Sequence, residues 1–379
     1  MTAQNGELLP EYRVIFLWNN NIIDGAYRFS HDWMIETLRL TDKDLISRLV
    51  RDEKNPEYII VSDKALSDYE SYKDLRYYLD HNQDSVFIFF TYEVFEPDLN
   101  LFDYAFAWNP DHVCGDRIIH NFPYMYDFRN EALLTNDLTR EDARLILQNR
   151  PRFCNFIYSH PCDVRDKFFH ALSGYKRVDS LGRHLNNSNV EASRLEKNWW
   201  DISIDMKAGY KFSIAMENAA YKGYTTEKIV TSLQAHTVPI YWGDPAVAEF
   251  INPKAFINIS DYSSFEEAIE RVREIDNNDE LWLDMVTQPW QTEEQRAKTL
   301  ESVAEYNRMF RNIFAQDRSK VMRTPHGTWG DFYRKNFHGF FPPFRERLKS
   351  NTINRLRRFI AKFLSRRTKN VLGKMLHLN

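Results

Sequence analysis

The sequence predicts an α/β protein with two domains that face each other across a cleft. Short apolar runs rich in Val, Ile, Phe and Tyr alternate with charged segments of helical character, which is typical of βαβ units in a parallel sheet. This alternation is interrupted near residues 130–150 and then begins again, so the chain contains two such series. A length of 379 residues agrees with two domains, because one domain takes about 150 residues.

The first domain is predicted over residues 1–145 and contains four short apolar runs that are expected to be buried strands. A charged segment, Asp63 to His81, lies between the second and third runs and is expected to be helical. The four predicted strands are Tyr12–Trp18, Tyr58–Ser62, Ser85–Thr91 and Phe102–Trp108.

The second domain is predicted over residues 146–320, and a closing helical segment is expected over residues 321–343. The predicted strands of this domain are Phe153–Tyr158, Lys211–Met216, Val238–Trp242 and Ala255–Ile259. Its predicted helices are Asp163–Leu172, Thr226–Ala235, Ser263–Ile275 and the long Glu293–Gln316.

The carboxyl-terminal tail, residues 344–379, is strongly basic. It holds 11 lysines and arginines and one acidic residue, a net charge of +10, whereas the rest of the chain carries a net charge of −14. Apolar residues at helical spacing between these cations predict a basic amphipathic helix that binds an anionic membrane surface. Packing of the same helix on the acidic body is the alternative. The acidic body itself argues against nucleic acid as a partner.

Composition and the amino terminus favour a cytoplasmic location. Three cysteines, Cys114, Cys154 and Cys162, cannot form a disulfide framework in a chain of this length and suit a reducing compartment. The first residues contain no signal-peptide pattern, and uninterrupted apolar runs end at about five residues, far short of the about 20 that a membrane-spanning helix needs. If the tail binds lipid, we expect a peripheral position at the inner face of the cytoplasmic membrane.

Several common motifs are absent from the sequence. The dinucleotide-binding G-x-G-x-x-G, the P-loop, H-E-x-x-H, C-x-x-C and G-x-S-x-G patterns do not occur. One D-x-D triplet, Asp42-Lys43-Asp44, precedes an apolar-periodic segment, where an aspartate more often caps a helix than binds a metal. The sequence therefore predicts no metal site.

The segment from Tyr210 to Gly243 carries the strongest functional signal. A predicted strand ends here in the polar pair Glu217-Asn218, and ligands of parallel α/β sheets bind at the carboxyl ends of strands. Glu227 and Lys228 fall in the first turn of the next helix, whose N-terminus favours a phosphate. A lysine at this position is unfavourable for the helix dipole unless an anion lies in front of it. The alternative is that these residues are ordinary surface caps.

Three parts of this segment are Tyr-Lys-Phe-Ser-Ile-Ala-Met-Glu-Asn (210–218), Tyr-Thr-Thr-Glu-Lys-Ile (224–229) and Thr-Val-Pro-Ile-Tyr-Trp-Gly (237–243). They resemble the donor-binding signature of glycosyltransferase family 10, the α1,3/4-fucosyltransferases. The chain departs from the family pattern at Met216 and Thr225, neither of which carries the chemistry. Four other segments are also similar to the family, residues 91–97, 101–104, 153–165 and 178–183, so the resemblance covers about residues 85–290.

This resemblance implies a GT-B fold, in which two Rossmann-like domains face each other, the first binding the acceptor and the second the donor. It implies an inverting transfer of L-fucose from GDP-β-L-fucose to the 3-OH of N-acetylglucosamine in N-acetyllactosamine-type glycans, with a Lewis x type product. Animal members carry an amino-terminal membrane anchor that this sequence lacks, which favours a bacterial enzyme. Two other interpretations stay open: a GT-B transferase that uses another nucleotide sugar, and a non-catalytic glycan-binding protein.

The resemblance also implies which residue acts as the general base. Glu93 follows a predicted strand at its carboxyl end and matches the position of the family's proposed base, which takes the proton of the acceptor hydroxyl. Glu96 and Asp103 are the competing carboxylates in the same stretch.

For the donor, the resemblance implies that Arg165 and Lys228 bind the pyrophosphate, Arg165 through its planar fork of donors. Asn218 and Tyr224 would contact phosphate or fucose, and Glu227 would accept hydrogen bonds from ribose or fucose hydroxyls. Two cations and a helix N-terminus can stabilise the departing diphosphate, so no cofactor is expected to be required. Some family members respond to Mn²⁺, which leaves stimulation by this ion open.

Overall fold

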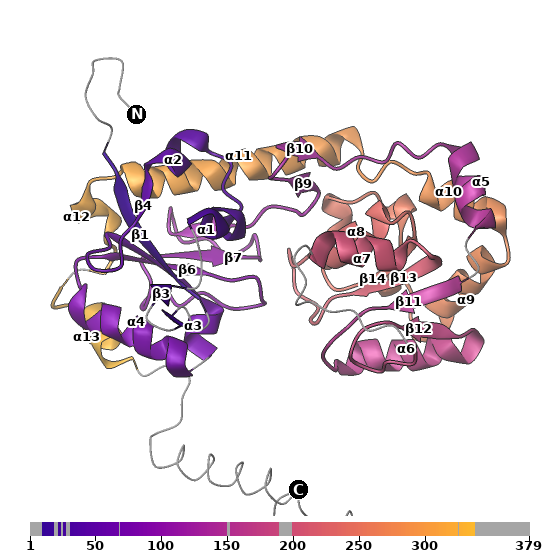
Figure 1. Ribbon diagram of the computed structural model, residues 1–379, viewed down its shortest axis with the longest axis horizontal. Coiled ribbons are helices and arrows are strands. Elements are labelled where there is room, and N and C mark those ends of the chain that lie inside the picture. Colours follow the sequence, from indigo (N-terminus) through magenta and orange to yellow (C-terminus); the bar gives the residue numbers. More distant parts are fainter. Residues whose placement is uncertain are drawn as a thin grey trace, which may run out of the picture.

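Two α/β domains lie side by side, and the long helix α11 (Glu293–Ala315) runs along the top of Figure 1 from the second domain to the first. The first domain is on the left of Figure 1 and the second domain is on the right. In this computed structural model, the described part of the chain comprises residues 10–18, 22–23, 26–27, 31–67, 69–149, 152–188, 199–324 and 326–337.

The first domain contains a sheet of six strands, all parallel, in the order β4-β1-β5-β6-β7-β8. Its four predicted strands are confirmed, whereas β4 and β8 are too short to stand out as apolar runs. The strands are β1 (Tyr12–Leu17), β4 (Leu49–Arg51), β5 (Tyr58–Ser62), β6 (Val86–Phe90), β7 (Tyr104–Ala107) and β8 (Ile118–His120).

Both faces of this sheet are covered, because successive side chains along a strand point to opposite faces. In β1, Phe16 packs with the helices of one face, while Ile15 and Leu17 pack with those of the other. One face is covered by α11 together with α1 (His31–Leu38) and α2 (Lys43–Arg48). The opposite face is covered by α3 (Asp63–Ser67) and α4 (Tyr69–His81), which confirm the predicted helical segment.

The aspartate of the D-x-D triplet caps a helix, as the sequence favoured. Asp42 is the N-cap residue of α2, and its side chain accepts the backbone N–H of Leu45 at 3.2 Å. The other carboxylate oxygen accepts Nε of Arg311 in α11 at 2.8 Å. Asp42 therefore joins two helices on one face of the first domain.

The second domain contains five parallel strands in the order β12-β11-β13-β14-β15. All four predicted strands and the predicted helices of this region are confirmed. The strands are β11 (Arg152–Phe156), β12 (Val178–Ser180), β13 (Tyr210–Met216), β14 (Val238–Trp242) and β15 (Ile257–Asn258).

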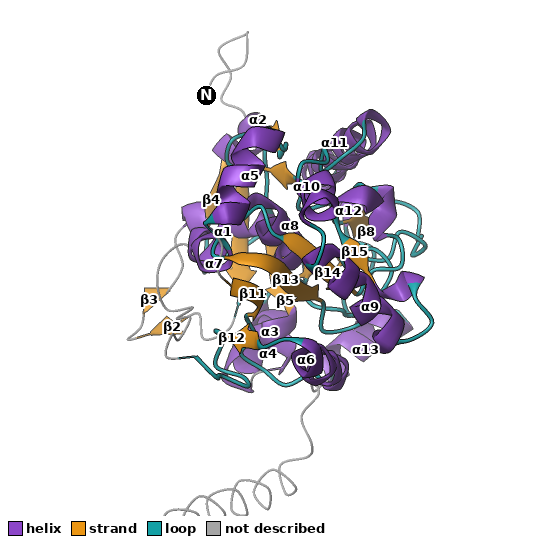
Figure 2. Ribbon diagram, turned by 90° about the vertical axis from the view of Figure 1, so that its right-hand side faces the viewer, coloured by secondary structure: helices purple, strands orange, loops and turns teal. Residues whose placement is uncertain are grey.

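Helices cover both faces of the second sheet as well, and Figure 2 shows the strands of both domains in orange with purple helices around them. The helices are α5 (Arg140–Gln148), α6 (Asp163–Tyr175), α7 (Trp199–Lys207), α8 (Glu227–Gln234), α9 (Phe265–Asp276) and α10 (Asp279–Val286). Two short ribbons and three single 3-10 turns complete the connections: β2 (Ile22–Ile23) with β3 (Ala26–Tyr27), β9 (Tyr126–Asp127) with β10 (Ala132–Leu133), and Val247–Glu249, Pro253–Ala255 and Ile259–Asp261.

The carboxyl-terminal helices pack on the first domain. The sequence predicted that the second domain extends to residue 320, so α11 was expected in the second domain. In α11, Tyr306, Phe310 and Phe314 are buried in the core of the first domain. The following α12 (Arg318–Val321) and α13 (Trp329–Asn336) stay there, and the hydroxyl of Tyr72 in α4 donates to the carbonyl of Phe337 at 2.6 Å. The apolar stripe of α11 is buried by this placement, because it packs on one face of the first sheet.

The boundary between the first and the second domain also lies before residue 145, where the sequence predicted it. Helix α5 packs on the second domain: Ala143 is buried in that core, and Arg140 pairs with Glu280 and Asp284 of α10, each at 2.6 Å. The tail predicted to form an amphipathic helix, residues 344–379, lies outside the described residues. Among the described helices, none combines the length and the apolar character that crossing a membrane requires.

Candidate active site between the two domains

The strand order of the second sheet points to a binding site between β11 and β13. In open parallel sheets, ligands bind at the carboxyl ends of the strands where the strand order reverses, and β11 lies between β12 and β13 at this reversal. Tyr158, just after β11, ties the two strand ends together: its hydroxyl accepts the backbone N–H of Met216 at 2.8 Å and donates to the carbonyl of Met216 or Ile214.

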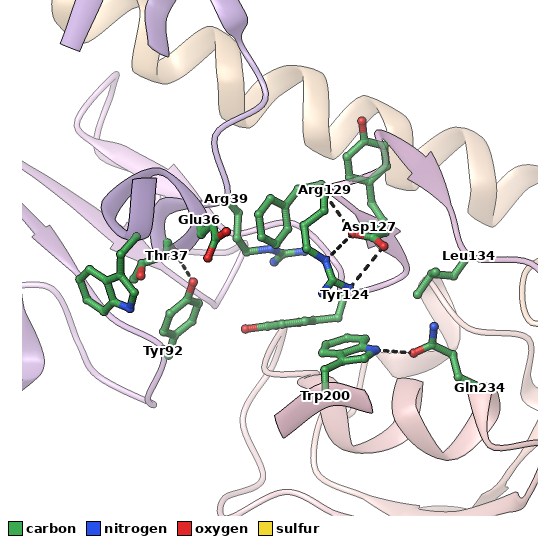
Figure 3. A pocket seen from close by; sticks show the side chains of 13 residues that line it. Glu36, Thr37, Arg39, Tyr92, Tyr124, Asp127, Arg129, Leu134, Trp200 and Gln234 are labelled. Atoms are coloured by element: carbon green, nitrogen blue, oxygen red, sulfur yellow. Dashed lines mark hydrogen bonds and ion pairs between the residues drawn. The ribbon is translucent and has the colours of Figure 1, made fainter. Parts of the chain in front are cut away.

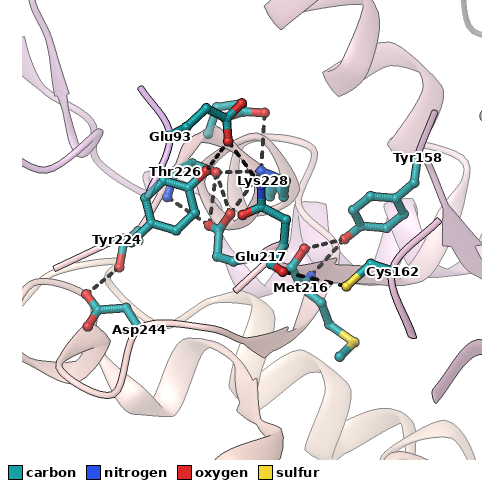
Figure 4. A network of polar contacts seen from close by, with 12 residues as sticks. Glu93, Tyr158, Cys162, Met216, Glu217, Tyr224, Thr226, Lys228 and Asp244 are labelled. Atoms are coloured by element: carbon teal, nitrogen blue, oxygen red, sulfur yellow. Dashed lines mark hydrogen bonds and ion pairs between the residues drawn. The ribbon is translucent and has the colours of Figure 1, made fainter. Parts of the chain in front are cut away.

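A buried carboxylate, Glu217, lies at the end of β13 in front of helix α8 (Figure 4). It accepts the backbone N–H and the hydroxyl of Thr226 at 2.8 and 2.9 Å, and Nζ of Lys228 at 2.9 Å. Burial alone would lower the pKa of Lys228, but Glu217 and Glu227 outweigh it and raise this pKa above its ordinary value. Lys228 therefore stays charged.

The anion expected in front of Lys228 is thus supplied by the chain itself. Thr226 is the N-cap residue of α8, yet its hydroxyl donates to Glu217 instead of capping the helix. The side chain of Lys228 remains 20% exposed, and Glu227 lies 3.8 Å from its Nζ with 27% of its own side chain exposed. Both residues can therefore still reach a ligand at the helix N-terminus.

Arg165 lies in the first turn of α6 and is 6% exposed. Its guanidinium carbon lies 4.2 Å from the centre of the Tyr158 ring, a cation–π contact. Its Nε has no hydrogen-bond partner among the described residues. A buried polar group without a partner is unfavourable, so this cation is well suited to an anionic ligand.

Glu93 of the first domain contacts the second domain. It follows β6, and its Oε2 accepts Nδ2 of Asn218 at 3.0 Å and the hydroxyl of Tyr224 at 3.4 Å (Figure 4). The hydroxyl of Thr91 accepts the backbone N–H of Glu93 at 2.9 Å, which fixes the loop. Burial and the charge of Glu93 raise the pKa of Tyr224, so its phenol stays protonated and donates. The Glu93 side chain is 44% exposed and accessible to a substrate.

The competing carboxylates lie in different environments. Asp103 is completely buried and accepts the backbone N–H groups of Phe87, Arg323 and Thr324 at 2.8 to 3.1 Å, so it holds the carboxyl-terminal segment on the first domain. Glu96 is 65% exposed at its side chain and contacts Nε2 of His112 at 3.0 Å. Asp103 is therefore structural, whereas Glu96 remains accessible.

A cavity of about 280 Å³ opens between the domains next to Tyr92, the residue before Glu93 (Figure 3). The rings of Trp33, Tyr92, Tyr124 and Trp200 contribute to its lining, and those of Tyr124 and Trp200 face each other with 6.2 Å between their centres. Trp200 is fixed by a 2.7 Å hydrogen bond from its Nε1 to Oε1 of Gln234.

This aromatic cavity is connected to Glu93 through ring contacts. Tyr124 stacks on Trp108 with ring centres 6.4 Å apart, and Trp108 meets Tyr224 edge to face at 5.1 Å. Tyr224 in turn reaches Glu93. The guanidinium of Arg39 also lines the cavity, 4.2 Å from the centre of the Tyr124 ring, and donates to the carbonyl of Phe122 at 2.9 Å.

The structure thus brings Glu93, Asn218 and Tyr224 into direct contact and places Lys228 beside Glu227. Arg165 joins them through Tyr158. Burial raises the pKa of Tyr158 to about 12, and the charges of Arg165 and Lys228 both act to lower it. No contact in the described part of the chain contradicts the predicted site residues, and none tests their roles.

Three features of the site were not predicted: the Glu217 carboxylate as an internal anion, the aromatic cavity, and Asp244. Oδ1 of Asp244 accepts the backbone N–H of Gly223 at 2.8 Å, and Oδ2 accepts the hydroxyl of Thr225 at 2.8 Å, which shapes the loop before α8. Glu217 lies inside the segment from Tyr210 to Gly243, which carries the family resemblance, and Asp244 directly follows this segment. Their polar character at a strand end was the available signal.

Gly223 is required by its conformation and by its neighbour in the other domain. Its φ is +82°, and a Cβ at this position would lie 2.1 Å from the carbonyl oxygen of Trp108. We expect Gly223→Ala to lower stability by about 1–2 kcal/mol through the dihedral and by about 1–3 kcal/mol more through the contact. Because the contact joins the two domains, the KM for the donor should also rise.

Gly115→Ala is the matched control for this prediction. Gly115 has a φ of +57°, but a Cβ there would meet no described atom within 4 Å, so only the dihedral cost applies. Thermal unfolding of the two variants separates the effects. Equal losses of Tm in both would show that the close approach to Trp108 is unimportant.

Comparison with known proteins shows which family part of the chain resembles. Residues 148–319 match the sequence model of the carboxyl-terminal part of glycosyltransferase family 10 (fucosyltransferase). The chain is 30% identical over 198 residues to a putative fucosyltransferase of Acanthamoeba polyphaga mimivirus. This alignment covers 51% of this chain and 32% of the relative. It is also 30% identical over 241 residues to the alpha-(1,3)-fucosyltransferase FucT of Helicobacter pylori, with 54% of this chain and 47% of the relative. The chain therefore spans less than half the length of these two curated relatives.

Solved structures of an alpha1,3-fucosyltransferase share the fold. One covers 86% of this chain and 95% of its own, with a TM-score of 0.61 and 21% identity. Another, determined with GDP-fucose, covers 84% of this chain and 94% of its own, with a TM-score of 0.59 and 22% identity. These likenesses confirm the GT-B fold, two Rossmann-like domains that face each other. The segment that carries Arg165, Glu217 and Lys228 is thus similar to the carboxyl-terminal part of glycosyltransferase family 10, the fucosyltransferases.

Proposed function

We propose that this protein transfers L-fucose from GDP-β-L-fucose to the 3-OH of N-acetylglucosamine in N-acetyllactosamine-type glycans, with inversion at the anomeric carbon. The acceptor oxygen attacks C1 of fucose, the bond from C1 to the phosphate oxygen breaks, the hydroxyl proton passes to Glu93, and GDP leaves. A displacement of this kind needs one base on the acceptor side and positive charge on the leaving-group side.

The contact of Glu93 with Asn218 and Tyr224 carries this proposal. This contact places Glu93, the proposed base, against the second domain, with its carboxylate 3.0 Å from the side-chain amide of Asn218. Arg165 and Lys228 lie on the other side, in the second domain, where they are suited to the diphosphate. Base and cations thus come from opposite domains, as a substrate held between the domains requires.

The aromatic cavity is the site that we assign to the acceptor glycan. The C–H faces of pyranose rings pack on aromatic side chains, and Trp33, Tyr124 and Trp200 offer such surfaces between the domains. The cavity lies next to Tyr92, so a sugar bound there would be adjacent to Glu93. Gln234 adds a polar group to the lining that a sugar hydroxyl could bind.

The proposed reaction uses charges of the chain itself for the departing diphosphate. Arg165, Lys228 and the N-terminus of α8 supply them. Among the described residues, no group of three or more His, Cys, Asp or Glu side chains is arranged to hold a metal ion. Transfer rates measured with EDTA and with added Mn²⁺ test whether an ion contributes.

An acceptor array with labelled GDP-fucose tests the proposal directly, and calorimetric titration with GDP-fucose, GDP-mannose and UDP-galactose tests the donor. Preferred binding of GDP-fucose and labelling of N-acetyllactosamine at the 3-OH are the expected results. Preference for another nucleotide sugar would indicate a different GT-B transferase. Glycan binding without nucleotide binding would indicate a glycan-binding protein.

For the basic tail we propose attachment to an anionic membrane at the cytoplasmic face, since each nearby cation contributes about 1 kcal/mol at such a surface. A truncation after Ser350 should stay active on soluble acceptors, because every proposed site residue precedes it in the sequence by a long stretch. The same truncation should lose binding to anionic liposomes in a sedimentation assay at about 0.1 M salt. Equal co-sedimentation of full-length and truncated protein would contradict membrane binding by the tail.

A further inference from the structure

A second lysine lies behind the donor site. Lys207 is the last residue of α7 and is 6% exposed. Its Nζ donates to the hydroxyl of Thr231 at 2.5 Å and to the carbonyl of Lys228 at 3.2 Å. Lys207 therefore holds the start of α8, whose first turn carries Glu227 and Lys228.

The partners of Lys207 differ from those of Lys211, the other lysine that is buried in the described part of the chain. Lys211 in β13 is 9% exposed and lies 3.5 Å from the carboxylates of Asp276 and Asp279. The hydrogen bonds of Lys207 within the described chain go to neutral oxygens, those of Thr231 and a backbone carbonyl. A buried ammonium without a carboxylate at contact distance is unfavourable unless further negative charge arrives nearby.

We propose that Lys207 is a positioning residue of the donor site, which anchors the first turn of α8 and places a positive charge behind the diphosphate when GDP-fucose binds. This inference rests on the function proposed above. In this proposal the contact with the donor comes from Lys228 and not from Lys207. It acts on the ligand through the position of Lys228 and through its charge.

The surroundings of Lys207 decide when this charge is present. Glu227 and Lys228 face it from α8, Glu217 faces it from the end of β13, and Tyr158 lines with it a small cavity of about 20 Å³. That volume is the size of about one water molecule, and Lys207 as a whole is only 6% exposed, so the ammonium is poorly solvated. Burial lowers the pKa of Lys207 to about 7 despite the carboxylates of Glu227 and Glu217, and the charge of Lys228 acts in the same direction as burial.

Donor binding should therefore be coupled to proton uptake near neutral pH. A phosphate charge about 10 Å away raises the pKa of a cation by about one unit at an effective dielectric constant of about 20. From a pKa of about 7, such a rise takes up about 0.4 proton per molecule at pH 7. GDP-fucose suits this measurement, because each of its phosphates has a single strongly acidic proton and the ligand itself does not titrate near pH 7.

Isothermal titration of the full chain with GDP-fucose at pH 7, in buffers of different ionisation enthalpy, measures this uptake. We expect a positive slope of binding enthalpy against buffer enthalpy for the wild type, no slope for Lys207→Met, and a several-fold weaker Kd for that variant. Lys207→Arg keeps the charge without titrating, so it should restore the affinity and not the slope. Lys211→Met is the matched buried control and should keep the slope.

Each outcome bears on one proposal. Binding of GDP-fucose with the same slope in wild type and Lys207→Met would overturn this inference and leave the proposed function intact. Absence of GDP-fucose binding in the wild type would overturn the proposed function and this inference with it.

A measurement without ligand checks the same lysine. Its pKa in the folded state, about 7, lies below the ordinary value of 10.5, so between these values the unfolded chain binds more protons and stability rises with pH. The gain in Tm of wild type relative to Lys207→Met should therefore increase from pH 6 to pH 9. A difference that does not change with pH would contradict a titrating Lys207.

Discussion

Glu93→Gln is expected to lower kcat for fucose transfer by about 10²–10⁴-fold, the usual effect of removing a general base. The amide keeps the shape of the side chain, and its oxygen can still accept the hydrogen bonds from Asn218 and Tyr224 that Glu93 receives in the structure. What it loses is the ability to take the acceptor proton. Initial rates with saturating GDP-fucose and acceptor measure the effect.

Donor binding separates this catalytic effect from damage to the site. The Kd for GDP-fucose of Glu93→Gln should stay within a few-fold of the wild type, because the cations that are proposed to hold the diphosphate come from the other domain. Glu96→Gln is the matched control: Glu96 follows in the same loop, contacts His112 and Tyr221, and should leave kcat nearly unchanged. Loss of activity in Glu96→Gln together with normal turnover of Glu93→Gln would assign the base to Glu96.

The sheets of both domains could be predicted because their strands are buried on both sides. Runs such as Val86–Phe90 are apolar at every position, and such runs identify strands of a parallel sheet without any help from tertiary structure. Strands β4 and β8 have three residues each and offer no such pattern. Helix α11 was predicted almost to the residue, but its domain was not, because an apolar stripe shows that a helix is packed and does not show against which sheet.

The residue types at the site were predictable, whereas their pairing was not. Glu93 and Asn218 are 125 residues apart in the sequence, and only the docking of one domain on the other brings them together. The position of Lys228 predicts a phosphate in front of the helix N-terminus, but spacing alone could not show that Lys228 also pairs with Glu217. The aromatic cavity collects rings from both domains, and no local pattern announces such a set.

Arg165→Ala is expected to lower kcat/KM for the donor by about 10²–10³-fold, since the loss of one partner of a buried charge pair costs 2–5 kcal/mol, an approximate range. Both KM and kcat should change, because the negative charge on the diphosphate grows as GDP leaves. Lys167→Ala is the control. Lys167 lies in the same helix and is exposed, and its replacement by alanine removes the same formal charge. Equal kinetics in the two variants would remove Arg165 from the donor site.

Lys228→Ala should weaken the donor reaction as well, but the two variants should differ in stability. Lys228 is the cation that compensates the buried Glu217, and removal of one partner of a buried ion pair destabilises a protein by about 3–5 kcal/mol. Arg165 packs on Tyr158, and its Nε has no hydrogen-bond partner among the described residues, so its removal takes away a buried group that lacks a partner there. We therefore expect Arg165→Ala to keep a Tm near that of the wild type while Lys228→Ala loses Tm together with activity.

The double variant Glu217→Gln/Lys228→Met removes both charges. It should recover most of the stability that Lys228→Ala loses, without recovering donor binding. Recovery of donor binding in that double variant would show that Lys228 serves Glu217 alone and does not bind the diphosphate.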